Sequence, residues 1–286
     1  MNAAIGRGTS TGQPIAKSAI DLAVHDLAAK RAGLTLREFL GGARERRDLK
    51  VSFTITGHDA DEARAQMLAA QAEGFTHFNF KAAVQPDTDI AVAKALKATI
   101  AAGGFLWSDA NQGFGIVDAK YVAHAFEDIG VDILEQPLPA DQFSGMKELR
   151  RATRIPLAVD EASVSSGDFM NYVVAGLVDY LIIKVTRSGG LWPSLQQVAV
   201  AQAAGLPMLV SGLTDGLLTK LAACQLASVF GISGPVALNG SQFIDEAGLY
   251  PAKSGIESGG KIRLNDLPGI GVEPDAEYLK RYAREI

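Results

Sequence analysis

The chain has almost no cysteine and no long apolar run. These two shortages exclude a protein held together by internal disulfides and one that crosses a membrane by an apolar helix. Cys224 is the only cysteine among 286 residues, so no internal disulfide can form. No stretch reaches the ~18 apolar residues of a membrane helix, and the N-terminus lacks the apolar core of a secretory signal. These absences predict a cytoplasmic protein with no membrane partner.

Basic residues are also in the minority. Lys and Arg number 27 against 32 Asp and Glu, which gives a formal net charge of −5. Because a nucleic-acid-binding protein presents a basic face, we expect no nucleic-acid partner. Hydrophobic residues make up 48% of the chain and charged residues 21%, which is ordinary for a globular protein long enough to bury a large core.

The stretch most informative about function is VDILEQPL, residues 131–138. It begins as an apolar strand and ends on Glu135, and Pro137 then lacks the N–H that a continuing central strand would need. A parallel β/α barrel carries its catalytic residues at the carboxyl ends of its strands. A buried strand that ends on a carboxylate therefore indicates an active site in such a barrel.

Charged residues end the neighbouring apolar runs at a regular spacing. Asp109 in FLWSDANQGF and Asp160 in IPLAVDEA lie 26 and 25 residues from Glu135. Lys81 in HFNFKAA and Lys184 in DYLIIKVT extend the series at intervals of 28 and 24 residues. A βα unit that returns to the next parallel strand takes about 25–30 residues. We therefore expect all five side chains at equivalent positions on consecutive strand ends, facing one mouth.

The same period along the chain predicts an α/β fold, a (β/α)7β TIM-type barrel with eight parallel strands and seven intervening helices. We expect the barrel to occupy residues 49–239. The expected strands are 51–56, 75–82, 105–109, 133–135, 156–160, 180–185, 206–211 and a weaker one at about 235–238.

The segments on either side of the barrel have other patterns. Residues 14–40 predict a helix broken at Gly33, because Ile20, Val24 and Leu27 recur at helical spacing. After the barrel, residues 240–286 contain glycine-rich turns and a short final helix from about Pro274.

Three carboxylates at one mouth repel one another, and a shared proton or a cation must relieve the repulsion. Oxygen ligands suit a hard cation such as Mg²⁺, with Mn²⁺ as the alternative. The flanking lysines suit an acid/base pair that works on opposite faces of a metal-bound substrate. One acidic residue at a strand end is more often a helix cap or a solvated loop residue, but five charged residues in register favour a site.

With these residues the chain resembles the enolase superfamily, in the muconate lactonizing enzyme subgroup of the mandelate racemase/muconate lactonizing enzyme family. Motifs along most of the chain carry the resemblance: AKSAIDLAVHDLAAKRAGLTLREFLGG, FNFKAA, SDANQGF, ILEQPL, AVDEA, IIKVTRSGG and LPGIGVE. A lysine, Lys184, on the sixth strand and Ser211 in place of a histidine on the seventh separate it from the mandelate racemase subgroup.

The resemblance implies an enzyme that removes the proton α to a carboxylate and stabilises the enediolate on Mg²⁺. Its metal ligands would be Asp109, Glu135 and Asp160, and its acid/base residues Lys81 and Lys184. The implied isomerase and lyase activities are racemisation or epimerisation, cycloisomerisation and dehydration of a small-molecule carboxylate. Family members are often homo-oligomers, so a homo-oligomer is implied as well.

The chain departs from the family in two places. Asn79 replaces the first lysine of the family's Lys-x-Lys pair, and an amide can hydrogen-bond but cannot lower the pKa of Lys81 as a neighbouring ammonium would. The family's N-terminal α+β capping domain opens with a three-stranded sheet. Residues 1–48 resemble only the helical end of that domain and 240–286 return to it, so we expect the sheet to be missing.

Four polar residues near the predicted strand ends are candidate substrate contacts, namely Asn79, Asn111, Glu161 and Ser211, and Asp245 in the tail segment SQFIDEAGLY is a fifth. Gly189 and Gly190 open a predicted helix whose N-terminus either accepts an anion or is a plain tight turn.

Two other functions stay open. A Schiff-base lyase or aldolase would use Lys184 as its nucleophile, although it would not need three carboxylates in register. A catalytically silent metal-binding barrel is the second alternative, and Asn79 and the incomplete capping domain point to it.

Overall fold

The computed structural model describes residues 12–43, 48–232, 234–238, 240–246, 248–250 and 256–282. The expected domain ends in residues 1–11 and 283–286, and the expected barrel end at Asn239, lie outside these ranges. In the described residues, no helix is long and apolar enough to cross a membrane.

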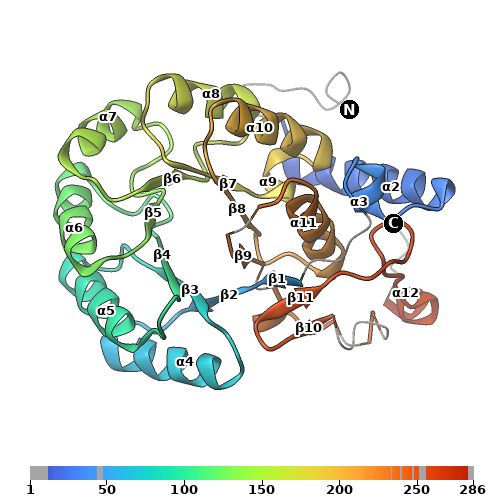
Figure 1. Cartoon of the computed structure of the whole chain (residues 1–286), viewed down its shortest axis with the longest axis horizontal. Helices are drawn as coiled ribbons and strands as arrows, with labels where there is room; N and C mark the ends of the chain where they lie inside the picture. Colours follow the sequence, from blue (N-terminus) through green and yellow to red (C-terminus); the bar gives the residue numbers. More distant parts are fainter. Residues whose placement is uncertain are drawn as a thin grey trace.

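Eight parallel strands form a nearly closed barrel, as the sequence predicted (Figure 1). In spatial and chain order they are β2 (Ser52–Ile55), β3 (His77–Lys81), β4 (Phe105–Asp109), β5 (Ile133–Glu135), β6 (Leu157–Val159), β7 (Tyr180–Ile183), β8 (Met208–Ser211) and β9 (Val236–Ala237). A parallel bridge between Val51 and Val236 brings the two ends of the sheet together.

Helices connect successive strands and cover the outside of the barrel, as right-handed parallel crossovers require. They are α4 (Ala60–Ala72), α5 (Pro86–Thr99), α6 (Ile116–Ile129), α7 (Phe143–Ala152), α8 (Ser166–Val174), α9 (Val185–Ser188) with α10 (Leu191–Ala203), and α11 (Leu217–Val229). Local sequence sets several starts: Asp59 caps α4, Pro86 opens α5, and Ser165 with Asp168 forms a capping box at α8.

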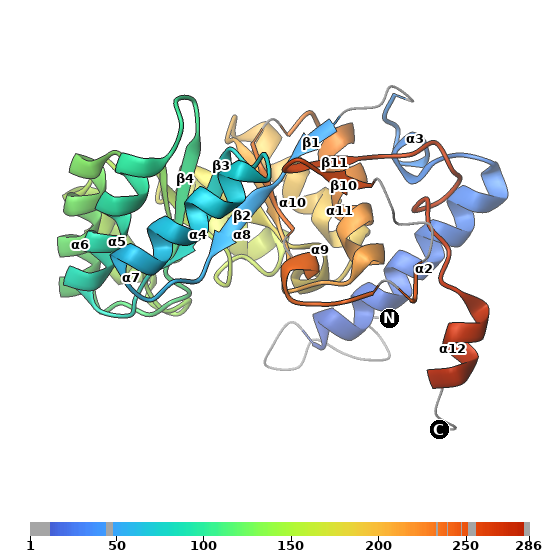
Figure 2. The same ribbon diagram turned by 90° about the horizontal axis from the view of Figure 1, so that it is seen from below.

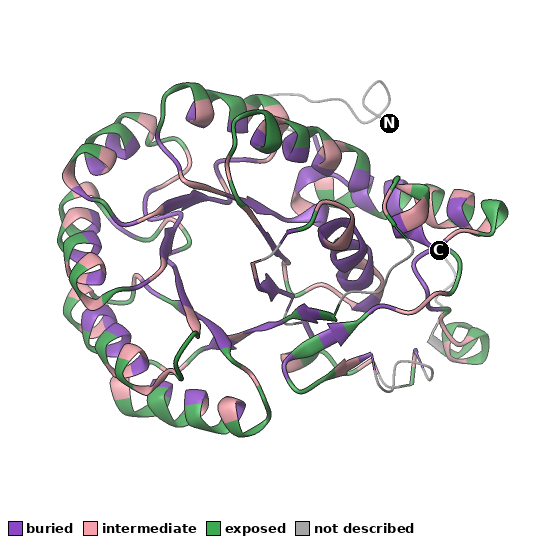
Figure 3. Ribbon diagram, in the orientation of Figure 1, coloured by how far each residue is buried: buried purple, intermediate pink, exposed green. Residues whose placement is uncertain are grey.

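The core has two layers, which follow from the alternation of side chains along each strand. Inside the barrel, a compact layer fills the lower part, made of Trp107, Ile133, Ala158, Ile182, Leu209 and Ala237. Outward-facing residues such as Phe78 and Phe80 pack against the helices and are almost completely buried. Figure 3 shows the result, with buried strands inside a ring of helices that are exposed on their outer faces.

The structure differs from the sequence-based expectation at the approximate start of the barrel, Leu49, and in the tail. Leu49 belongs to β1 (Asp48–Lys50), which pairs antiparallel with β11 (Lys261–Arg263) rather than with the barrel. Together with β10 (Glu257–Ser258) these strands form a separate three-stranded sheet, although only turns and a helix were expected in this tail. The expected final helix is α12 (Ala276–Tyr282), and a 3₁₀ turn, η1 (Gly240–Gln242), follows β9.

The predicted N-terminal helix is present and breaks where expected. Helix α2 (Pro14–Ala32) ends at Gly33, whose φ of 69° is left-handed, and α3 (Leu36–Phe39) follows. The apolar face of α2, with Ile20, Val24 and Leu27, is exposed, while its buried residues include Lys17, Ser18 and Asp21. Figure 2 shows α2 beside the barrel, away from its central axis.

The polar face of α2 is buried because Asp21 has a specific partner. Asp21 Oδ2 accepts a hydrogen bond of 2.6 Å from the backbone N–H of Leu191, the first residue of α10. Gly190 at this junction has a φ of 121°, and a Cβ there would overlap the Asp21 side chain. The anion at this helix N-terminus is therefore the protein's own carboxylate.

Candidate active site

A cavity of about 350 Å³ opens at the carboxyl ends of the barrel strands. It brings together seven of the candidate residues: Asn79, Lys81, Asp109, Asn111, Glu135, Lys184 and Ser211. Trp107, Arg187, several small polar residues and the apolar Leu213, Ala237 and Phe243 complete its walls. A mouth at this end of a TIM-type barrel is where such folds place their chemistry.

The strand register explains why these side chains meet. Lys81 is paired with Asp109, and Asp109 with Glu135, so these three lie side by side on β3, β4 and β5. Glu135 is paired with Ala158, so Asp160 lies two residues further along. The expectation of strictly equivalent positions thus holds for three of the residues. An offset of two residues keeps Asp160 on the same, inner face.

Lys81 and Asp109 form one side of the site. Lys81 Nζ donates to Asp109 Oδ2 at 2.8 Å and to Asn111 Oδ1 at 2.7 Å. The lysine side chain is 46% exposed, whereas that of Asp109 is 5% exposed. Asn111 Nδ2 in turn donates to Glu161 Oε1 at 3.0 Å, so Asn111 links the lysine to a second acidic residue.

Glu135 lies at the centre of the carboxylate series and is completely buried. Its Oε2 accepts a 2.5 Å hydrogen bond from the Trp107 indole, while Oε1 has no hydrogen-bond partner. Burial raises the pKa of Glu135 well above its usual value, and the Asp109 carboxylate raises it further against the opposing effect of Lys184. Trp107 was not among the candidate residues, although it lies on the same face of β4 as Asp109.

Lys184 and Asp160 form the opposite side of the site, and both are buried. Lys184 Nζ lies 2.5 Å from Asp160 Oδ2, and Arg187 Nε lies 3.1 Å from Asp160 Oδ1. Neither Asp160 oxygen has a partner with hydrogen-bond geometry, so these contacts are ion pairs. Arg187 was not predicted to contact the carboxylates; it comes one helical turn after Lys184, in α9.

The protonation of Lys184 reflects two opposing effects. Burial lowers the pKa of Lys184, but the carboxylates of Asp160 and Glu135 together outweigh burial and raise the pKa above its ordinary value. Lys184 is therefore a buried ammonium ion while these carboxylates carry their charge. The residue follows β7 directly as the N-cap of α9, rather than lying within the strand as expected.

Several residues at the mouth have a left-handed backbone that is unusual outside glycine. Ala83, Asn111, Gln112, Gln136 and Thr214, with φ between 38° and 70°, follow the ends of β3, β4, β5 and β8. Strained conformations of this kind persist where surrounding contacts enforce them, and they concentrate at functional sites.

Gln136 shows how such contacts hold the site together. Its buried Oε1 accepts from the backbone N–H groups of Asp160 and Ala162, each at 3.1 Å. Its Nε2 donates to the Leu138 carbonyl at 2.8 Å. Since Gln136 follows Glu135 directly, it fixes the end of β6 relative to the end of β5. This role of Gln136 was not predicted from the sequence.

The remaining candidates divide into two groups. Asn79 is buried, and its Oδ1 accepts from Ser52 Oγ and Thr54 Oγ1 at 3.1 and 3.0 Å. Ser211 lines the cavity, and its hydroxyl donates to the Ala237 carbonyl at 3.3 Å. Glu161 contacts Asn111 but does not line the cavity, and Asp245 is exposed outside it. The structure therefore places neither acid in the cavity wall.

The carboxylates fit a hard divalent cation by chemistry and by burial. Asp109, Glu135 and Asp160 offer only oxygen atoms, and Glu135 Oε1 and both Asp160 oxygens are buried without hydrogen bonds. Among the described residues, no three Asp, Glu, His or Cys side chains converge as a ready-made metal site. Two of the carboxylates are instead ion-paired, Asp109 with Lys81 and Asp160 with Lys184.

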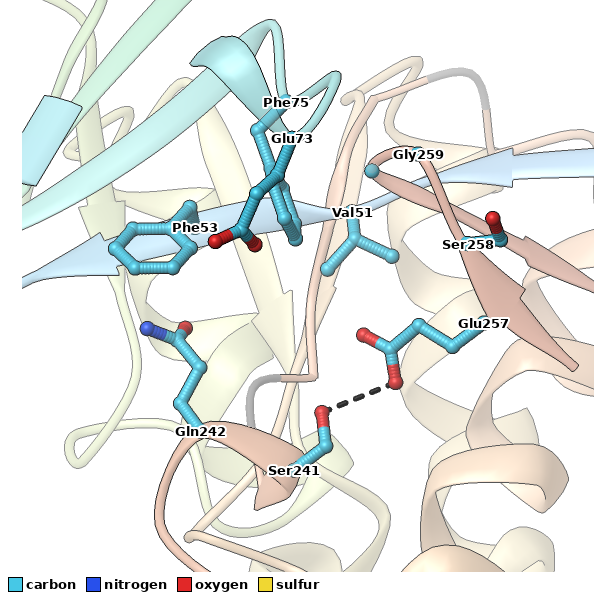
Figure 4. Close-up of a pocket in the computed structure, with 10 residues that line it drawn as sticks. Val51, Phe53, Glu73, Phe75, Ser241, Gln242, Glu257, Ser258 and Gly259 are labelled. Atoms are coloured by element: carbon cyan, nitrogen blue, oxygen red, sulfur yellow. Dashed lines mark hydrogen bonds between the residues drawn. The ribbon is translucent and has the colours of Figure 1, made fainter. Parts of the chain in front are cut away.

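A larger cavity of about 510 Å³ lies beside β2, the turn after α4 and β10 (Figure 4). Phe53 and Phe75 meet edge to face in its wall, and Ser241 Oγ donates to Glu257 Oε2 at 3.0 Å. Glu257 also pairs with the buried Lys220 at 2.5 Å. None of the candidate residues lines this cavity, so the smaller cavity is the candidate active site on the basis of its chemistry.

Comparison with known proteins agrees with this architecture. A family model described as enolase C-terminal domain-like matches residues 62–278. Muconate cycloisomerase 1-2 of Acinetobacter lwoffii is 28% identical over 98% of this chain and 72% of that enzyme. L-Ala-D/L-Glu epimerase of Clostridium acetobutylicum is 27% identical over 92% of this chain and 73% of that enzyme.

A solved structure shows the same fold. The crystal structure of a dipeptide epimerase from Cytophaga hutchinsonii, complexed with Mg and the dipeptide D-Ala-L-Val, aligns with a TM-score of 0.87 at 23% identity. The alignment covers 94% of this chain and 73% of that one.

Proposed function

The chain belongs to the enolase C-terminal domain-like family and is an isomerase or lyase of the enolase superfamily, and from that premise we propose a Mg²⁺-dependent enzyme that abstracts the proton α to a carboxylate. The enzyme stabilises the resulting enediolate and acts as a racemase or epimerase, a cycloisomerase or a dehydratase on a small-molecule carboxylate. One observation carries the proposal: a buried carboxylate with an unpartnered oxygen, Glu135, lies between two lysines on opposite walls of one cavity.

Asp109, Glu135 and Asp160 would hold the cation. Bound Mg²⁺ would supply positive charge beside the substrate carboxylate, where negative charge develops as the α-proton leaves. Gln136 supports this set, because its side chain holds the backbone at Asp160 and its own backbone continues from Glu135. A metal site depends on such supporting contacts as well as on its ligands.

Lys81 and Lys184 would move the proton. They lie at the ends of β3 and β7, four strands apart in an eight-stranded barrel, and hence on opposite walls. The lysine on one wall can remove the α-proton from its face of the substrate, and the lysine on the opposite wall can donate a proton to the other face, which gives racemisation. Loss of a β leaving group or ring closure after the first step would give the other two reactions.

The ion pairs suggest how Lys184 becomes a base. Its pKa is high because carboxylates surround it, whereas its burial acts to lower the pKa. A cation bound by Asp160 and Glu135 would cancel much of their charge. Burial would then dominate, and the pKa of Lys184 would fall toward the range where the neutral amine is available as a base.

Exchange of the substrate α-proton in D₂O tests this function. We expect Mg²⁺-dependent exchange with a small carboxylic acid, and we expect Lys81→Met and Lys184→Met each to lose exchange of one enantiomer selectively. General acid/base residues contribute about 10²–10⁴-fold, so the losses are measurable by proton NMR with separate enantiomers. Equal loss of both enantiomers in each variant would contradict the two-face assignment.

The same experiment separates the alternatives. A silent barrel would bind Mg²⁺ and exchange no α-proton with any acid. A Schiff-base enzyme would instead be trapped on Lys184 by borohydride with a carbonyl substrate. The buried ion pair of Lys184 with Asp160 argues against this second route, because an ammonium ion is not a nucleophile.

A further inference from the structure

The larger cavity, of about 510 Å³, lies outside the seam where the last barrel strand, β9, meets the first, β2. Consecutive strands from β2 to β9 are each joined through a helix, but β9 meets β2 without one. Residues of β2, of η1, of the β10–β11 turn and of the turn after α4 line this space instead. Ligand pockets typically measure about 300–1,000 Å³, so the cavity is large enough for a small molecule.

Glycines hold one wall of this cavity in place. Gly260 has a φ of 67°, and a Cβ there would lie 2.8 Å from the Cα of Phe75. A Cβ on Gly74 would likewise lie 3.0 Å from the Cα of Gly259. The turn between β10 and β11 therefore packs backbone against backbone on the turn after α4, which joins two segments far apart in the chain into one fixed wall.

The charged side chains in the described wall of this cavity are both acidic, namely Glu73 and Glu257. The nearest cation, Lys220, lies behind the wall with its side chain 4% exposed, and it pairs with Glu257 Oε2. Glu257 Oε1 and the Glu73 carboxylate have no hydrogen bond or ion pair among the described residues. Figure 4 shows both carboxylates directed into the cavity from different walls.

Two further lysines lie next to the cavity in the chain but face away from it. Val51 and Phe53 line the cavity, so Lys50 points to the opposite face of the same extended segment. Lys261 is paired with Lys50 across β1 and β11, and paired residues share a face. These lysines therefore do not neutralise the acidic wall.

The neutral polar groups of the wall are largely committed to the protein itself. Gln242 Oε1 accepts from the Thr54 N–H at 3.0 Å, and its Nε2 donates to the Thr54 carbonyl at 3.3 Å. Ser241 Oγ donates to Glu257. The carboxylates are thus the main polar groups that a ligand would meet.

Apolar surface adjoins these carboxylates. The rings of Phe53 and Phe75 meet edge to face with their centroids 5.2 Å apart, and Val51 lies in the same wall. Figure 4 shows the Glu73 carboxylate beside the two rings. An ammonium or guanidinium group is attracted both to a carboxylate and to an aromatic face, and its hydrocarbon part gains from apolar contact.

We propose that this cavity binds a small organic cation, an apolar body that carries an ammonium or guanidinium group. The cationic group pairs with Glu73, Glu257 adds negative charge from the other wall, and the apolar body packs on Val51, Phe53 and Phe75. The inference is independent of the proposed function, because the two cavities share no described lining residue.

Three probes of similar size and different charge test the proposal: 2-phenylethylamine, 2-phenylethanol and 3-phenylpropionate. At neutral pH they are cationic, neutral and anionic. NMR titration of the full chain without Mg²⁺ should show the amine binding at least about tenfold more tightly than either of the others, from one ion pair and one cation–π contact. Equal affinities, or no binding of the amine, would overturn the proposal.

Charge-removing variants locate the bound amine. Glu73 is exposed, so Glu73→Gln should fold normally, weaken binding of the amine by about fivefold and leave binding of the alcohol unchanged. Glu148 on α7 is also exposed, with 57% of its side chain accessible, and lies far from the cavity. Glu148→Gln removes the same charge and should bind the amine as the wild type does. Equal weakening in both variants would mean diffuse attraction to an acidic protein and would overturn the proposal.

A variant of the candidate active site separates the two cavities. Glu135→Gln should bind the amine as tightly as the wild type, because Glu135 lines only the smaller cavity. Loss of amine binding in Glu135→Gln together with full binding in Glu73→Gln would place the amine in the candidate active site and overturn the proposal.

Discussion

The two sides of the candidate active site contain the same kind of ion pair in very different surroundings. Lys81 pairs with Asp109 at the rim, and its side chain is 46% exposed. Lys184 pairs with Asp160 in the interior, where the two side chains are 5% and 0% exposed. The Lys81 ammonium group can reach water although Asp109 is buried, so this pair should contribute less to stability than the Lys184 pair, in which both partners are buried. We therefore expect the Lys184 side chain to be held in one position, the fixed side of the site, and the Lys81 side chain to change its conformation easily, the adjustable side.

Removing each lysine in turn should break this comparison most clearly. Lys184→Met leaves Asp160 buried with only Arg187 as a counter-ion, and we expect it to lower the free energy of unfolding of the metal-free protein by about 3 kcal/mol. The matched Lys81→Met should lower it by less than about 1 kcal/mol. Urea denaturation of both variants measures the difference, and equal losses would contradict the assignment of a fixed and an adjustable side.

Gln136 offers a second comparison, with a half-buried glutamine, Gln66, as its control. Gln136→Leu removes two hydrogen bonds to buried backbone N–H groups, which should cost about 2 kcal/mol and weaken Mg²⁺ binding. Gln66 also accepts from two backbone N–H groups, those of Thr56 and Gly57, but it is half-buried rather than buried. Gln66→Leu should cost less than half as much and leave Mg²⁺ affinity unchanged. Unchanged Mg²⁺ affinity in Gln136→Leu would show that Gln136 does not position the ligands.

The pH dependence of Mg²⁺ binding should reveal the raised pKa of Glu135. The cation needs the carboxylate, so a proton competes with it, and affinity should fall up to about tenfold per pH unit below that raised pKa. Without metal, Glu135 binds its proton more tightly in the folded protein than in the unfolded protein. Its contribution to stability is thus present below its unfolded pKa, and is lost as the pH rises through its folded pKa.

Calorimetric titrations with Mg²⁺ at several pH values, and thermal unfolding with and without Mg²⁺, measure both effects. Glu135→Gln is the control, because it lacks this titration. A Mg²⁺ affinity that does not change with pH across the acidic range would contradict the assignment.

Asn111 should give the smallest effect, because it supports the exposed side. Asn111→Ala removes the contacts to Lys81 Nζ and Glu161 Oε1. We expect a loss of stability below about 1 kcal/mol and a wider range of Lys81 side-chain conformations, measurable by NMR of the lysine Nζ. A loss as large as that of Lys184→Met would mean that the two sides are equally rigid.

The barrel and the five charged strand ends could be predicted from the sequence because both recur at a regular interval along the chain. The interval of 24–28 residues indicates a βα unit, and the apolar run before each charged residue indicates a buried strand. Trp107 was within reach of the same reasoning, since it lies two residues before Asp109 and must share its face.

Other features depend on contacts that no local pattern shows. The sheet of β1, β10 and β11 is made of two- and three-residue strands, and its pairs are brought together only by the folded chain. Arg187 contacts Asp160 because α9 turns back toward the carboxylates. The burial of Asp21, rather than of the apolar face of α2, depends on the partner it finds at Leu191.

The central claim is a cation site at the buried carboxylates, and Mg²⁺-dependent thermal stabilisation tests it most directly. At about 100 times its Kd, a ligand adds roughly 2.7 kcal/mol, which should raise the Tm by roughly 5 °C. We expect this shift in the wild type and its loss in Glu135→Gln, which keeps the shape of the side chain but not its charge. An equal shift in both proteins, or no shift in the wild type, would contradict it.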